Sequence, residues 1–222
     1  MKNWHLCALL AVSIPSIAAA TDEIEFQSTG VSNMTTSADS FGSTNFNGWV
    51  ISATGSSGSP GLIPAFNLQV NATCITGACL TTPLDVFYTV TNFTTVAPAN
   101  TLQTNFTAQQ TAGESSRAIT WADSLNGEFG GGLPAVPADH LGTVTVTTAL
   151  GSGSAIGNPA EGPTPYSMTV EEIFTDSTGG VAAFNASANI SSAPEIDPAS
   201  AMGGLTLLAG GLAVLRGRRR KK

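Results

Sequence analysis

The stretch Phe66-Asn67-Leu68-Gln69-Val70-Asn71-Ala72-Thr73-Cys74 decides the fold class. Apolar residues stand at every second position, and Asn, Gln or Thr fills the positions between them. Successive side chains of a β-strand point to opposite faces, so this period of two gives one strand an apolar face and a polar face. The stretch therefore predicts a strand that is buried on one side only.

The same alternation recurs along most of the chain between residues 21 and 193. Gly, Pro and Ser accumulate in segments 55–61, 130–137 and 151–165, which are interpreted as turns or linkers. The last of these begins with Gly151-Ser152-Gly153, which lacks the Lys and third Gly of phosphate-binding loops. About nine strands are expected, the others lying at residues 24–28, 49–54, 84–90, 102–108, 118–122, 143–150, 166–174 and 181–190.

The pattern of strands predicts an all-β fold. Short half-buried strands without crossover helices indicate antiparallel sheets, and two such sheets must cover each other to hide their apolar faces. We therefore expect an antiparallel β-sandwich, either jelly-roll or immunoglobulin-like, because strand order leaves little trace in a sequence. Glu171 and Glu172 interrupt the alternation, and a β-bulge there is expected to turn both carboxylates outward and Ile173 inward.

The N-terminus has the features of a secretory signal peptide. Lys2 supplies a positive charge, an apolar segment of about a dozen residues follows, and small residues Ala18 and Ala20 form a cleavage site. Residues 1–20 are therefore predicted to be removed by signal peptidase during export. The sandwich domain is expected to span residues 21–193.

The last 29 residues combine a short motif, an apolar run and a basic tail. Pro194, Glu195 and Ile196 precede residues 199–215, which carry no charge. Seventeen helical residues span roughly 26 Å, close to the lower limit for crossing a bilayer core. Positive residues stay on the cytoplasmic side, so the tail sets the topology of the chain. Its basic residues are Arg216, Arg218, Arg219, Arg220, Lys221 and Lys222.

Segment 194–222 resembles the PEP-CTERM sorting domain of bacterial surface proteins, in a variant form where Ile196 replaces the second Pro. The resemblance implies that an exosortase-type membrane protease recognises and cleaves the segment. It also implies a destination at the cell envelope, cell surface or extracellular matrix. Proteins with this tail are associated with bacteria that produce exopolysaccharide, which makes exopolysaccharide an implied partner.

Charge is distributed unevenly along the chain. Between residues 21 and 193, Arg117 is the only Lys or Arg, against thirteen Asp and Glu. Nucleic acids and anionic lipids are bound through basic patches, so neither is an expected partner of this domain. Asn-x-Ser/Thr triplets occur at Asn33, Asn71, Asn92, Asn105, Asn185 and Asn189; they fit either glycosylation or a polar β-surface.

Cys74 and Cys79 are predicted to form a disulfide, since export leads to an oxidising compartment and Cys7 lies in the signal peptide. The alternatives are a zinc site, which would need further ligands, and a redox dithiol, which is more often Cys-x-x-Cys. His140 is the only histidine of the domain. No metal or cofactor is expected.

No assembled catalytic motif is present in the sequence, and an enzyme is not expected. The Gly-x-Ser-x-Gly elbow is missing and His140 has no adjacent nucleophile. Two carboxylates from separate strands could still converge, as glycoside hydrolysis requires. Trp121 is the candidate glycan contact, because Trp49, Tyr88 and Tyr166 are in phase with apolar neighbours and are expected in the core.

The sequence thus predicts an exported surface or extracellular-matrix protein with a structural or adhesive role. The alternative is a carbohydrate-binding β-sandwich module, followed by a polysaccharide-active enzyme.

Overall fold

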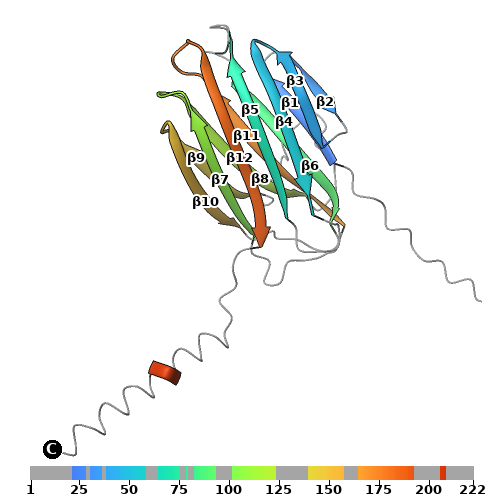
Figure 1. Ribbon diagram of the computed structural model, residues 1–222. Helices are drawn as coiled ribbons and strands as arrows, with labels where there is room; N and C mark the ends of the chain where they lie inside the picture. Colours follow the sequence, from blue (N-terminus) through green and yellow to red (C-terminus); the bar gives the residue numbers. More distant parts are fainter. Residues whose placement is uncertain are drawn as a thin grey trace, which may run out of the picture.

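The computed structural model of the chain is an antiparallel β-sandwich (Figure 1). It describes residues 22–28, 31–36, 39–58, 65–75, 79, 83–93, 102–123, 140–157, 165–192 and 206–208. The twelve described strands are β1 (Asp22–Ser28), β2 (Val31–Thr36), β3 (Ser40–Phe46), β4 (Trp49–Ser57), β5 (Phe66–Cys74), β6 (Leu84–Phe93), β7 (Leu102–Gln110), β8 (Ser115–Asp123), β9 (His140–Val146), β10 (Leu150–Gly157), β11 (Tyr166–Thr175) and β12 (Ala182–Ser192).

The strands form two six-stranded sheets. The first sheet has the order β2-β1-β6-β11-β8-β9, and the second has the order β10-β7-β12-β5-β4-β3. Every described pair of neighbouring strands is antiparallel. The predicted all-β sandwich and the strand at 66–74 are therefore confirmed.

The core lies between the two sheets and is built from alternate residues of most described strands. In β5, Phe66, Leu68 and Val70 are at most 2% exposed, while Gln69 and Asn71 face outward. Apolar burial of this kind is worth about 1.5–3 kcal/mol for each large side chain. Trp49, Tyr88 and Tyr166 are buried in the core as predicted.

Tyr88 is fully buried in the core and requires a glycine opposite it. Its ring lies so close to Gly55 that a Cβ there would stand 2.3 Å from Tyr88 Cε2. The Tyr88 hydroxyl donates a hydrogen bond of 3.1 Å to Asp22 Oδ2, which also accepts one of 2.9 Å from Ser57 Oγ. The polar end of the buried ring is thereby satisfied.

Three described strands were not expected from the sequence. β2 and β3 were overlooked, and β10 lies in segment 151–165, which was wrongly interpreted as linker. The single strand expected at 143–150 is interrupted between Val146 and Leu150, where the chain passes from the first sheet to the second. β4 also extends to Ser57, into the segment interpreted as a turn at 55–61.

The bulge expected at Glu171 and Glu172 was wrong. β11 pairs with β8 in unbroken register from Ser167 to Thr175, so the two side chains point to opposite faces. Glu172 is 0% exposed, and burial raises its pKa well above the usual value. Ile173 lies on the outer face between Asp85 and Arg117. The irregularity occurs instead between Tyr166 and Met168.

The predicted disulfide between Cys74 and Cys79 is present, with an S–S distance of 2.08 Å. Both cysteines are buried at the end of β5, close to Trp49 in the neighbouring strand. Among the described residues, no helix is long and apolar enough to cross a membrane. Most of the apolar run 199–215 lies outside the described residues.

Replacing Gly55 by Ala tests the packing of Tyr88. The added methyl group would force the buried ring or the β4 backbone to move, and we expect a loss of about 1–3 kcal/mol in the free energy of unfolding. Gly42→Ala is the matched control, because a Cβ at Gly42 meets nothing within 4 Å. Equal unfolding midpoints in urea for the two variants would contradict this packing.

Candidate functional site

The two sheets differ in charge. The six strands of the second sheet contain no Asp, Glu, Lys, Arg or His. All charged residues of the described strands, Arg117 among them, belong to the first sheet. The sandwich therefore has one uncharged side and one charged side.

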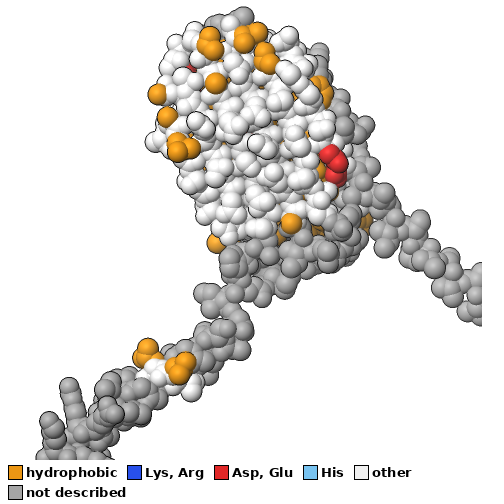
Figure 2. Space-filling view, in the orientation of Figure 1, with side chains coloured by type: hydrophobic (Ala, Val, Ile, Leu, Met, Phe, Trp, Pro, Cys, Tyr) orange, Lys and Arg blue, Asp and Glu red, His pale blue; other side chains and the backbone are white. Residues whose placement is uncertain are grey.

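The outer face of the second sheet carries amide and hydroxyl groups in rows across its strands. Asn67 of β5 pairs with Asn189 of β12, which pairs with Asn105 of β7. Two rows further on, beyond the pair of Gln69 and Ser187, Asn71 and Asn185 are paired in the same way. Figure 2 shows this face as a broad white field of uncharged groups, with hydrophobic side chains mainly near its margins and an acidic patch, in red, at its right-hand edge. It offers hydrogen-bond donors and acceptors without net charge.

The polar outer face of the second sheet explains the Asn-x-Ser/Thr triplets of its strands. Residues two apart in a strand share a face, so a strand with a polar outer face brings Asn and Ser or Thr together at that spacing. The triplets at Asn71, Asn105, Asn185 and Asn189 all lie on strands of the second sheet. A polar β-surface is thus sufficient to account for these four triplets.

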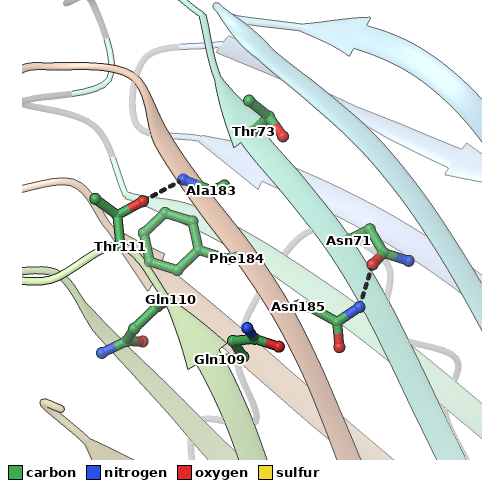
Figure 3. A pocket seen from close by; sticks show the side chains of 8 residues that line it. All are labelled: Asn71, Thr73, Gln109, Gln110, Thr111, Ala183, Phe184 and Asn185. Atoms are coloured by element: carbon green, nitrogen blue, oxygen red, sulfur yellow. Dashed lines mark hydrogen bonds between the residues drawn. The ribbon is translucent and has the colours of Figure 1, made fainter. Parts of the chain in front are cut away.

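A hollow of about 440 Å³ opens at one end of this face (Figure 3). Its volume falls within the usual range for small-molecule sites. Asn185 Nδ2 donates a hydrogen bond to Asn71 Oδ1, and the backbone N–H of Ala183 donates one of 2.9 Å to Thr111 Oγ1. The lining residues come from β5, β7, β12 and the residue after β7: Asn71, Thr73, Gln109, Gln110, Thr111, Ala183, Phe184 and Asn185.

Two turns next to the hollow are joined through Glu114. Its carboxylate accepts hydrogen bonds of 2.6 Å from Ser177 N and 2.5 Å from Thr178 Oγ1. Gln110 Nε2 donates to the carbonyl oxygens of Glu114 and Val146. These bonds hold the ends of β7 and β12 in place, so the hollow is formed by a fixed part of the fold.

Gln110 also carries an unusual acceptor. Its Oε1 is buried and has no hydrogen-bond partner among the described residues. A buried acceptor of this kind is normally paired with water or with a ligand. The Gln110 side chain lies on the inner side of β7, where it reaches Val146 of the first sheet, so this acceptor faces away from the outer surface.

The outer face of the first sheet brings together two carboxylates from separate strands. Glu171 of β11 is paired with Phe87 of β6, and Asp85 of β6 is paired with Ile173 of β11, which makes the two acids diagonal neighbours. Diagonal neighbours lie about 7–8 Å apart, within reach of long side chains. Arg117 of β8 is paired with Ile173 on the other side.

These acids influence each other electrostatically. Burial raises the pKa of Asp85 to about 6, and Arg117 acts in the opposite direction. Burial and the neighbouring Asp85 raise the pKa of Glu171 to about 7, while Arg117 and Trp121 partly counter that rise. Glu171 is 3% exposed, so it is the less accessible member of the pair.

Trp121, the glycan contact expected from the sequence, also lies on the first sheet. It is half-buried, and its ring meets that of His140 edge to face at a centroid distance of 5.0 Å. The hollow lies on the other sheet. The structure therefore separates Trp121 from the amide-lined site, which sequence reasoning missed because its residues are spread from 71 to 185.

One group of potential metal ligands occurs among the described residues, formed by Cys74, Cys79 and Asp176. The two sulfur atoms are joined in the disulfide, so they are not available as thiolate ligands. The remaining site residues predicted from sequence lie outside the described residues: Ala18, Ala20, Pro194, Glu195, Ile196, Arg216, Arg218, Arg219, Arg220, Lys221 and Lys222.

Solved structures with weak similarity to this chain include a phage tailspike domain and a carbohydrate-binding module. The enzymatically active domain of tailspike protein 4 from bacteriophage CBA120 is 13% identical with a TM-score of 0.30, over 63% of this chain and 19% of that chain. A family 11 carbohydrate-binding module from Clostridium thermocellum, solved with a β-1,3-1,4-linked tetrasaccharide, is 11% identical with a TM-score of 0.31, over 71% of this chain and 97% of that chain.

The chain thus spans about a fifth of the tailspike domain's length. No family model and no curated protein matches the chain. Both TM-scores are low, so neither likeness assigns a ligand to this chain.

Replacing Glu171 by Gln tests the buried acid pair. The pKa of Glu171 is higher in the folded protein than in the unfolded chain, so folding favours the protonated, neutral form of the acid. The stability of the wild type therefore falls as the pH rises from the unfolded pKa through about 7. Wild type and Glu171→Gln should therefore be equally stable near pH 4. At pH 8 the variant should be more stable, by up to about 3 kcal/mol. Urea unfolding at both pH values is the measurement, and a pH-independent difference would contradict the assignment.

Proposed function

We propose that this chain is an exported carbohydrate-binding β-sandwich that recognises neutral glycans through the hollow on its second sheet. The observation that carries the proposal is the complete absence of charged residues from the six strands of that sheet. In a domain with thirteen acidic residues, such a face is available for a ligand that is polar but uncharged.

The chemistry of the lining suits sugar hydroxyl groups. Each hydroxyl is both a donor and an acceptor, and Asn and Gln side chains supply both functions within one group. Asn71, Gln109 and Asn185 present such amides at the hollow. Ala183 adds a small exposed apolar group beside these amides.

The first sheet provides a second candidate surface. Trp121 could stack on a sugar ring, and the diagonal pair Asp85 and Glu171 is the arrangement that would support a polysaccharide-active enzyme. The near-complete burial of Glu171 favours the second sheet as the binding face. The expectation that the chain is not an enzyme stays a prediction.

The sequence signals supply the proposed destination. Signal peptidase would remove residues 1–20, and an exosortase-type protease would process the segment that begins at Pro194. The domain would then be displayed on the cell or released into the extracellular matrix. Exopolysaccharide is present at the proposed location, and the uncharged face suits a neutral ligand. Neutral exopolysaccharide is therefore the ligand class that we propose.

Binding to an array of neutral and uronic-acid-containing glycans tests the ligand class. We expect binding to neutral glycans, weakened about 3- to 10-fold by Asn185→Ala or Gln109→Ala, because each removes hydrogen bonds to the ligand. Gln69→Ala is the matched control, since Gln69 is an exposed amide of the same sheet outside the hollow. Loss of binding in Trp121→Ala, with Asn185→Ala unaffected, would move the site to the first sheet.

Mass spectrometry of the mature C-terminus tests the sorting proposal separately. In cells that contain the exosortase, we expect the surface protein to end near Pro194. In cells without it, the C-terminus should remain intact. An intact Lys222 on the surface protein of wild-type cells would contradict exosortase processing.

A further inference from the structure

Strand β10 is an unprotected edge of the second sheet. It pairs with β7 and has no second strand partner among the described residues, and Figure 1 shows it at the margin of the sandwich. Its sequence, Leu-Gly-Ser-Gly-Ser-Ala-Ile-Gly, contains neither charge nor proline. Natural sheets usually protect an edge with charged side chains, proline, a bulge or a short strand, because exposed backbone groups invite pairing with another chain.

The other described edge strands are protected in one of these ways. β2, β3 and β9 each show a register shift against their neighbour. β10 instead pairs with β7 without a shift over eight consecutive residues, from Leu150 to Gly157. Of the four described edge strands, β10 is therefore the one that pairs with its neighbour without a register shift.

The inner side of β10 explains this regularity. Its inward residues are Gly151, Gly153, Ala155 and Gly157, and β9 packs directly beneath them. A Cβ at Gly153 would stand 2.6 Å from Val144 Cγ1. Close contact with β9 thus supports β10 on its inner side, while its outer side chains are exposed.

Those outer side chains include two exposed apolar residues. Leu150 is 76% exposed and Ile156 is 62% exposed, with Ser152 and Ser154 between them on the same face. Two large apolar side chains at the ends of an uncharged edge are costly to leave in water, and a partner that covers both would stabilise the edge.

The spacing of these residues is self-complementary. If two copies of β10 pair antiparallel about Gly153, Leu150 of one copy lies opposite Ile156 of the other. Ser152 then lies opposite Ser154, and Gly151 lies opposite Ala155. Directly opposite residues of an antiparallel pair share a face, so every apolar side chain meets an apolar partner and every Ser meets a Ser.

We propose that β10 is a homodimerisation strand, at which two copies of this chain join their second sheets edge to edge. The twofold axis runs perpendicular to the sheet through Gly153, and the interface is isologous. Both uncharged outer faces then lie on the same side of one continuous sheet. Two hollows on one face would allow a dimer to engage a polymer at two points, which raises its effective affinity. The dimer itself does not depend on the glycan proposal.

A disulfide-trapping experiment tests the register. In the full chain carrying Cys7→Ser, the pair Ser152→Cys and Ser154→Cys should place each new thiol opposite its counterpart in the other copy, about 4.5–5.5 Å between Cβ atoms. Oxidation should therefore yield a covalent dimer on a non-reducing gel. Either substitution alone places the two thiols diagonally and should give little dimer. Equal trapping in single and double variants, or none in the double variant, would overturn the proposal.

Charge on the edge tests the interface itself. In Leu150→Lys/Ile156→Lys the opposite residues would repel, and we expect the dimer dissociation constant to rise at least about tenfold. Ile75→Lys/Val181→Lys is the matched control, because these residues are also exposed and apolar, at 50% and 69% exposure, and are not part of β10. Sedimentation equilibrium of the full chain in density-matched detergent should show a dimer for wild type and control. A monomeric wild type, or a β10 variant that dimerises as well as the control, would overturn the proposal.

Discussion

The close approach of two sheets across a shared apolar core is the constraint on which the structure depends. Each strand must give every second residue to that core, and the available space decides which side chains fit. Where Tyr88 fills the gap, β4 has Gly55 opposite its ring. Where β9 packs against β10, the inward positions of β10 are again mostly glycine, because a Cβ there would clash with β9. The pattern of apolar residues and the pattern of glycines are thus two consequences of one geometry.

The same constraint leaves the outer residues free to differ between the sheets. The strands of the first sheet retain the charged residues, including Arg117 and the diagonal acids Asp85 and Glu171. The strands of the second sheet contain uncharged residues alone, with the amides gathered on their outer face. A ligand that is rich in hydroxyl groups and carries no charge suits the second surface, and the export proposed above would bring the domain to such ligands.

Residue alternation was sufficient to predict the fold class and most strands, because burial on one side leaves a period of two in the sequence. The Cys74–Cys79 disulfide was predicted separately, from the pair of cysteines in a domain expected to be exported. Alternation failed for β10, whose small inward residues carry no apolar signal. β3 was missed although Asn47-Gly48, both with positive φ, marks a two-residue hairpin turn before Trp49. The hollow could not be found in this way, since strand pairing alone brings Asn71, Gln109 and Asn185 together.

The most direct test is a titration with a neutral oligosaccharide identified on the array, followed through the side-chain amide resonances of the protein. The account predicts that the resonances of Asn71, Gln109 and Asn185 shift together with one dissociation constant. Those of Gln69 and the Trp121 indole should remain unchanged. Shifts confined to Trp121, or no saturable shift at the hollow, would contradict neutral-glycan binding by the second sheet.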